Sequence, residues 1–157
     1  MSKSLGTAVV LGVVIIVGGL YLALAPAPAV APTEEEEQQT VGFTYMNASS
    51  DLIQVELPFP GAVVGKTFSA IGKARGTWYF EASFPYVLLD KDGNVLAEGH
   101  ADALSDWMTE EFVPFKADIV VLNQNYIGPA VLILKNDNPS GDAIRDRSVA
   151  IPITVEY

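Results

Sequence analysis

The chain has 157 residues, half of them hydrophobic, with a formal net charge of −10 and no cysteine. A protein this acidic does not bind phosphate backbones by releasing counterions, so we expect no nucleic-acid partner. Without cysteine there are neither disulfides nor thiolate zinc sites, and an exported domain of this chain must be stabilised by its apolar core alone.

The chain starts with an apolar run that is long enough to cross a membrane. Residues 5–25 are uncharged, and 18 or more such residues in one helix span a hydrocarbon core of about 30 Å. Lys3 precedes the run and Glu34–Glu37 follow it, which favours an N-terminus inside the cell. We therefore predict a short cytoplasmic N-terminus at residues 1–4 and a transmembrane signal-anchor helix at residues 5–25, with the rest of the chain outside the cytoplasm.

A cleaved signal peptide is the alternative for the same segment. The sequence from Ala25 to Ala31 contains the A-x-A pattern of signal-peptidase sites, and a cut after Ala29 avoids a proline directly behind it. The apolar run is longer than the roughly 7–15 residues of a secretory core segment, which favours the anchor. Cleavage would instead release the domain as a secreted protein.

Residues 26–50 have the composition of a stalk. The first half is rich in alanine and proline, which favours extended backbone, and the glutamates that follow repel one another. We expect this segment to hold the following domain a short distance from the bilayer.

From residue 51 onward, short apolar segments alternate with turn signals. Their patterns predict seven strands, at about residues 52–57, 67–74, 79–89, 95–99, 112–122, 130–134 and 149–155. Asp92-Gly93 between two apolar runs indicates a hairpin rather than a calcium loop, since Ala101 stands where such a loop needs a glutamate. We predict an all-β domain at residues 51–157, an antiparallel β-sandwich of about seven strands.

Several motifs in this domain resemble one bacterial family. They are Trp78 with Phe80-Glu81-Ala82, Phe84-Pro85, Asp106-Trp107, Phe112 and Asp137-Asn138-Pro139-Ser140-Gly141, behind an opening with Pro58, Pro60, Gly61 and Val64. With these motifs nearly the whole domain resembles the immunoglobulin-like domain associated with bacterial spore germination proteins. The resemblance implies an immunoglobulin-like sandwich with an extracytoplasmic, envelope-associated role, and it brings no catalytic residues.

Two kinds of loop are candidates for binding a partner. Trp78 and Trp107 lie near predicted strand ends, where an aromatic ring either fills the core or forms a platform for a glycan or peptide. Asp137 and Asn138 lie in a segment of oxygen-bearing side chains, which is typical of a turn and otherwise of a loop that holds a hard cation together with Asp146. We predict partner binding at these four residues, Trp78, Trp107, Asp137 and Asn138, and no metal or cofactor.

No group of residues indicates catalysis. His100, the only histidine, lies close to Asp102 and Ser105, but the three are neighbours on or beside one strand and no nucleophile-elbow motif accompanies them. A surface histidine on a strand explains the pattern. A hydrolase would need paired carboxylates or an activated nucleophile, for which the sequence offers no convincing case.

Other charged residues are assigned structural roles. Glu81 lies between aromatic residues in a stretch that should be partly buried, and a buried carboxylate is costly unless it is paired. We expect an ion pair with Lys73 or Arg75 on the preceding strand. Arg145 and Arg147 are assigned to a solvated surface.

These features predict a non-catalytic module at the cell surface. We expect a single-pass membrane protein whose immunoglobulin-like domain binds or assembles with another envelope protein through a sheet edge or the aromatic loops, with a link to sporulation or germination in spore formers. The alternative is a carbohydrate- or peptidoglycan-binding module whose tryptophans stack on sugar rings.

Overall fold

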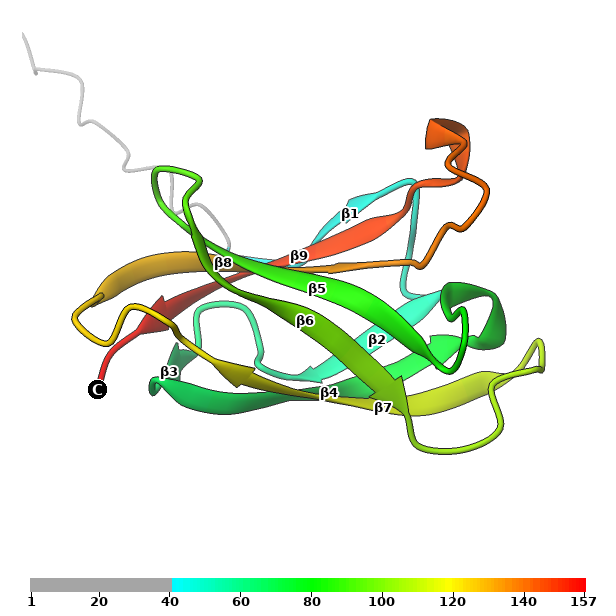
Figure 1. Cartoon of the computed structure of the whole chain (residues 1–157), viewed down its shortest axis with the longest axis horizontal. Coiled ribbons are helices and arrows are strands. Elements are labelled where there is room, and N and C mark those ends of the chain that lie inside the picture. Colours follow the sequence, from blue (N-terminus) through cyan, green and yellow to red (C-terminus); the bar gives the residue numbers. More distant parts are fainter. Residues whose placement is uncertain (1–40) are drawn as a thin grey trace, which may run out of the picture. The chain divides into compact units, whose positions relative to one another are not determined.

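Strands dominate residues 41–157, which are the residues that the computed structural model describes (Figure 1). They are β1 (Thr44–Met46), β2 (Ile53–Leu57), β3 (Val63–Val64), β4 (Thr67–Arg75), β5 (Ser83–Asp90), β6 (Val95–Ala103), β7 (Phe112–Val120), β8 (Gly128–Lys135) and β9 (Ser148–Val155). Two short 3-10 helices, η1 (Gly76–Trp78) and η2 (Ala143–Arg145), lie in connections. The predicted anchor at residues 5–25 and most of the predicted stalk lie outside the described residues. Within residues 41–157, no helix is long and apolar enough to cross a membrane.

The strands form one curled sheet. In hydrogen-bonded order it runs β1-β9-β8-β5-β6-β7-β4-β2, and β3 pairs with β9. Every pairing is antiparallel except that of β3 with β9, which is parallel. The β6–β7 ladder holds only two residue pairs, Asp102–Lys116 and Ala103–Phe115. The sheet folds over at this short ladder, so that the layer β1-β9-β8-β5-β6 lies above the layer β7-β4-β2 in Figure 1.

Alternate side chains fill the space between the two layers. In β7 every second side chain from Val113 to Ile119 is buried, and β9 shows the same alternation from Val149 to Val155. This is the pattern of strands with one face on a core and the other in water. The core has an aromatic centre at Phe84, whose ring centroid lies 5.0 Å from Phe115, 5.2 Å from Tyr79 and 6.3 Å from Trp78, all in edge-to-face arrangements.

The structure confirms the all-β prediction and corrects its details. Each predicted strand has a counterpart, but the strand expected at 79–89 begins only at Ser83, because residues 80–83 form a tight turn. Two strands were not predicted, β1 and β3, which are too short to show an apolar alternation. Strand β1 falls within the range 26–50 that was assigned to the stalk, so the folded sheet begins before residue 51.

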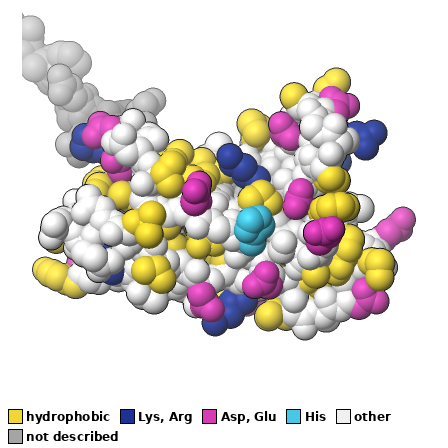
Figure 2. All heavy atoms as spheres, viewed as in Figure 1, with side chains coloured by type: hydrophobic (Ala, Val, Ile, Leu, Met, Phe, Trp, Pro, Cys, Tyr) yellow, Lys and Arg dark blue, Asp and Glu magenta, His cyan; other side chains and the backbone are white. Residues whose placement is uncertain are grey.

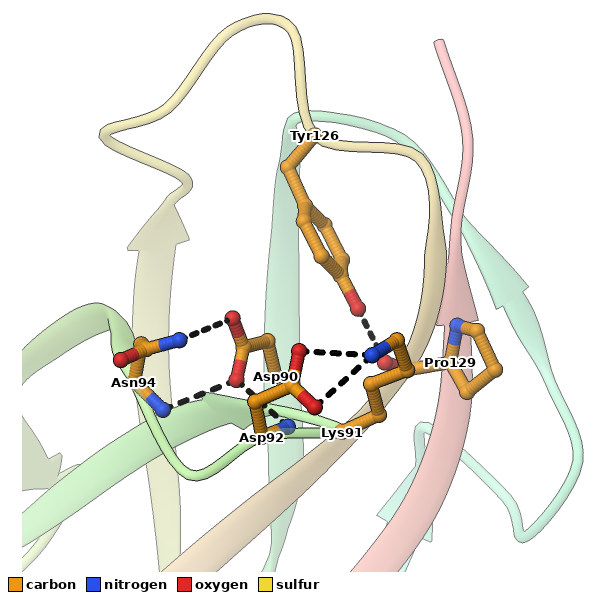
Figure 3. A network of polar contacts seen from close by, with 6 residues as sticks. All are labelled: Asp90, Lys91, Asp92, Asn94, Tyr126 and Pro129. Atoms are coloured by element: carbon orange, nitrogen blue, oxygen red, sulfur yellow. Dashed lines mark hydrogen bonds and ion pairs between the residues drawn. The ribbon is translucent and has the colours of Figure 1, made fainter.

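The hairpin between β5 and β6 is closed by Asp90, as Figure 3 shows. One oxygen of its carboxylate accepts hydrogen bonds from the backbone amides of Asp92 and Asn94, both 2.8 Å long, and the other accepts from Asn94 Nδ2, also at 2.8 Å. Gly93 has a φ of +84°, which favours glycine. This geometry confirms the hairpin turn predicted from Asp92-Gly93.

Acid should weaken this turn. The hydrogen bond from the Asn94 side chain, followed by those from the backbone amides, lowers the pKa of Asp90 below its ordinary value. A carboxyl group whose pKa is lowered on folding contributes stability that is present above its unfolded pKa and is lost as the pH falls through the folded pKa. The free energy of unfolding should therefore decrease below about pH 4, and less steeply in Asp90→Asn. Urea unfolding between neutral pH and strongly acidic pH measures both slopes. Asp92→Asn is the control, and equal slopes for wild type and Asp90→Asn would contradict the prediction.

Candidate functional site

Four connections meet at one end of the sheet, at the right of Figure 1. They are residues 47–52, 76–82, 104–111 and 136–147. Antiparallel pairing places them together, because Met46 at the end of β1 lies opposite Ser148 at the start of β9, and Arg75 at the end of β4 lies opposite Phe112 at the start of β7. We call these four connections the loop end.

Backbone hydrogen bonds tie the connections of the loop end to one another. The Asp137 amide donates to the Trp78 carbonyl oxygen at 3.0 Å, which joins 136–147 to 76–82. The Gly76 amide donates to the Glu111 carbonyl oxygen at 3.2 Å, which joins 76–82 to 104–111. The structure thus brings Trp78 and Asp137, two of the predicted site residues, into direct contact across 59 positions of sequence.

The two tryptophans of the loop end have different surroundings. Trp78 is 1 % exposed and packs edge-to-face on Phe84, whereas Trp107 is half-buried and packs at the border of the core. A buried indole offers no ring face to a ligand, so Trp78 acts as a core residue here. Stacking on a sugar would depend on Trp107.

The two polar candidates support the shape of the 136–147 connection. Asn138 Nδ2 donates to the Asp142 carbonyl oxygen and to Asp146 Oδ1, both at 2.8 Å, and Asn138 Oδ1 accepts from the Ser140 hydroxyl at 2.6 Å. Its neighbour Asp137 is half-buried. The Asn138 amide is therefore occupied within the loop, which agrees with the turn interpretation of this segment.

The three residues that suggested a triad lie at the surface. His100 and Asp102 are exposed on the outer face of β6, and Ser105 is exposed just beyond the strand. The histidine side chain is visible in cyan on the surface in Figure 2. This placement agrees with a surface histidine on a strand.

A strained turn leads from η1 into β5. Phe80 and Ser83 exchange both backbone hydrogen bonds, at 3.0 and 3.1 Å, and the two residues between them, Glu81 and Ala82, have φ of +50° and +64°. Positive φ at both central positions defines a type I′ turn, which normally contains Asn-Gly. Non-glycine residues in this conformation cost about 1–2 kcal/mol each, so the surrounding packing must hold the turn in place.

The prediction that Glu81 is partly buried and forms an ion pair with Lys73 or Arg75 is wrong. The side chain is exposed on the turn. Arg75 Nη1 instead lies 3.6 Å from Glu111, and its guanidinium covers the Phe112 ring together with Lys73. A turn residue with positive φ points its side chain to solvent, so the charge needs no partner.

Relieving the strain should stabilise the domain. In Ala82→Gly the positive φ becomes favourable, which should raise the free energy of unfolding by about 0.5–1 kcal/mol after the greater flexibility of the unfolded chain is subtracted. Thermal unfolding measures the gain. Ala103→Gly in β6 is the control and should destabilise. A lower melting temperature for Ala82→Gly would show that this backbone conformation carries no strain.

A cleft of about 400 Å³ opens beside this turn, between the 76–82 and 136–147 connections. Tyr79 and Phe80 form its aromatic side, while Asp137, Arg145 and Arg147 are among its polar lining. A second hollow of about 290 Å³ lies next to it and shares Arg147. The cleft combines an apolar wall with convergent charged groups, which is the usual composition of a ligand site.

Tyr79 is held as a neutral wall of this cleft. Its hydroxyl donates to the Val113 carbonyl oxygen at 2.7 Å, and burial raises the pKa of the phenol far above its ordinary value. The side chain is 4 % exposed and packs on Phe84, so it is locked to the core. The aromatic wall is therefore rigid on one side and exposed at Phe80 on the other.

Sequence analysis did not connect the two arginines with the cleft. Arg145 and Arg147 were assigned to a solvated surface; Arg145 is exposed as expected, whereas Arg147 is half-buried, and both line the cleft. Side-chain hydrogen bonds of Asn136 direct this segment inward: Nδ2 donates to the Arg145 carbonyl oxygen at 3.1 Å and Oδ1 accepts from the Arg147 amide at 2.7 Å. Basic residues next to an Asn/Asp-rich loop were the only available signal.

Comparison with known proteins identifies the domain. The family model described as the immunoglobulin-like domain of bacterial spore germination matches residues 52–143. That range includes the 76–82 and 104–111 connections and most of the 136–147 connection. Neither the curated proteins nor the solved structures contain a significant match. The matched range covers more than half of the chain, and the chain therefore belongs to the family of immunoglobulin-like domains of bacterial spore germination.

Proposed function

We propose that this chain is a membrane-anchored, extracytoplasmic binding module that assembles with another protein of the cell envelope through the loop end. Membership of the family supports a non-catalytic immunoglobulin-like module with a role linked to germination or sporulation in spore formers. The apolar run at residues 5–25 supports the anchor. In immunoglobulin variable domains the binding loops also lie together at one end of the sandwich.

One observation carries the proposal: large apolar side chains project from three of the four connections of the loop end, two of which line the polar cleft. Leu104, Met108 and Ile144 are 61 %, 76 % and 85 % exposed, and Phe80 is 40 % exposed. At the right of Figure 2, hydrophobic and charged side chains are mixed over this end of the domain. Apolar side chains around a specific polar centre are typical of surfaces that bind proteins.

The direction of β1 supports the loop end as the binding face. The strand runs toward the loop end, from Thr44 opposite Ala150 to Met46 opposite Ser148. Residues 41–43 therefore enter the sheet from the side away from the loops and do not cover the loop end.

Crosslinking in cells of the native organism tests the proposal. The full chain is expressed in place of the native copy, crosslinked and purified, and captured envelope proteins are identified. The double variant Met108→Asp/Ile144→Asp should lose a partner that the wild type captures, because two charges would enter the interface. The control is Leu122→Asp/Ile127→Asp, whose positions are also exposed, at 75 % and 63 %, but lie in the β7–β8 connection at the opposite end.

The outcomes separate the proposal from its alternatives. Equal capture by both double variants would contradict the loop end as the binding face. Capture of wall glycan without protein, lost in Trp107→Ala, would support the carbohydrate-binding alternative. Fractionation of the same cells tests the anchor: the full-length chain should stay with the membrane, and a shortened chain in the medium would show cleavage after about Ala29.

A further inference from the structure

We propose that the cleft at the loop end binds a carboxylate of a peptide, with the guanidinium of Arg147 as the group that holds it. The inference rests on the proposed function and names the chemistry that the partner presents. It follows from four observations: which cations are paired, which polar groups of the cleft are free, how deeply Arg147 lies, and what surrounds it.

Most cations of the described residues are engaged within the domain. Lys66 donates to the Tyr126 carbonyl oxygen, and three further cations form ion pairs, Arg75 with Glu111, Lys91 with Asp92 and Lys116 with Asp118. Lys73 forms neither an ion pair nor a hydrogen bond, but its ammonium lies over the Phe112 ring. Within residues 41–157, the side chains of Arg147 and Lys135 form no ion pair, hydrogen bond or cation–π contact, and both line the hollows of the loop end. In a chain of net charge −10, two cations without such a partner thus lie at the loop end.

The two asparagine side chains of the cleft are already used. Both ends of the Asn136 amide and both ends of the Asn138 amide bond within the 136–147 connection. Arg145 Nε lies 4.0 Å from Asp142, a long contact at an exposed pair. The groups left for a ligand are the Arg147 guanidinium, the more exposed Arg145 guanidinium, the exposed Thr77 hydroxyl and the Asp137 carboxylate. The last two form no side-chain hydrogen bond within the described residues.

This set of free groups selects the ligand class. An arginine presents a planar fork that binds a carboxylate through two parallel hydrogen bonds, and partial burial of Arg147 reduces screening by water. Asp137 would repel the double charge of a phosphate but can accept the N–H of a peptide backbone next to a singly charged carboxylate. The exposed Phe80 ring offers an apolar wall for the neighbouring side chain. The cleft of about 400 Å³ accommodates one or two residues of a peptide.

Titration of the full chain, purified in a neutral detergent, with small peptides tests the inference by NMR. The probe is N-acetyl-Phe-Glu amide, which has one carboxylate, and its control is the neutral N-acetyl-Phe-Gln amide. We expect saturable shifts of the Arg147 Nε–H and Asp137 amide resonances with the first, and affinity at least about tenfold weaker with the second. N-acetyl-Phe-Ala with a free C-terminus tells a chain end from an acidic side chain as the source of the carboxylate.

Two variants locate the interaction. Arg147→Gln should lower the affinity for the acidic peptide at least about tenfold. The domain should stay folded, because Arg147 bonds to Asn136 only through its backbone. Lys116→Gln removes the same charge from β7 and should leave the affinity unchanged. Arg147→Lys keeps the charge without the fork and should recover only part of the affinity.

Each result is decisive for this inference. Equal binding of the neutral peptide, normal binding by Arg147→Gln, or the absence of saturable shifts would overturn it. The crosslinking experiment separates it from the proposed function. If Arg147→Gln still captures the partner that Met108→Asp/Ile144→Asp loses, the loop end remains the binding face and only the carboxylate inference fails.

Discussion

Replacing Gly76 by alanine should destabilise the domain by about 3 kcal/mol or more, or prevent its folding. The new Cβ would lie 1.8 Å from the carbonyl oxygen of Thr109 and 2.4 Å from that of Trp107. Both are backbone atoms of the 104–111 connection, which has to move away before the methyl group fits. That movement would also break the hydrogen bond from the Gly76 amide to Glu111.

Denaturant unfolding of Gly76→Ala beside Gly93→Ala measures this effect. Gly93 has open space around it and a φ of +84°, so its replacement should cost only about 1–2 kcal/mol of backbone strain. Trp107 lies in the 104–111 connection. Displacement of this connection should therefore also change the fluorescence of Trp107 in any folded fraction. Equal unfolding midpoints for the two variants would show that the two connections do not approach as closely as described.

The second large effect is expected for Phe84→Ala. Phe84 is fully buried and contacts Trp78, Tyr79 and Phe115 edge-to-face. Removing the ring loses its burial and leaves a cavity, which costs about 3–5 kcal/mol. The free energy of unfolding of a whole domain of this size is about 5–15 kcal/mol, so the variant should unfold at a moderate temperature.

The control for this variant lies on the turn directly before β5. Phe80 is 40 % exposed, so Phe80→Ala should cost less than about 1 kcal/mol, while Phe84→Leu should fall between the two. Denaturant unfolding followed by tryptophan fluorescence ranks all three. If Phe84→Ala lowers the free energy of unfolding no more than Phe80→Ala does, Phe84 is not the aromatic centre of the core.

The sequence by itself determined the fold class and most of the core. Alternating apolar residues mark one face of each strand, and this pattern is visible locally because side chains of a strand point to opposite faces in turn. The hairpin at Asp92-Gly93 follows from turn chemistry within a few residues. Combined motifs such as Trp78, Phe84-Pro85 and Asp106-Trp107 indicated the family that the comparison then showed.

The tertiary structure decided what no local pattern encodes. Strand β1 has only three residues and pairs with β9 about a hundred positions later, so its pairing depends on the finished sheet. The Glu81-Ala82 turn lacks the usual glycine, because packing around it rather than its own preference selects positive φ.

At the loop end, too, the sequence determined some features and the tertiary structure decided others. Sequence analysis identified Asp137 as a candidate residue, and its contact with Trp78 follows only from the order in which β4, β5, β8 and β9 pair. Arg147 carries the same charge as every other arginine in the sequence. Arg75 and Arg145 lie beside the carboxylates of Glu111 and Asp142, whereas Arg147 lines the cleft and forms no ion pair within the described residues. Such distances are set by the folded chain alone.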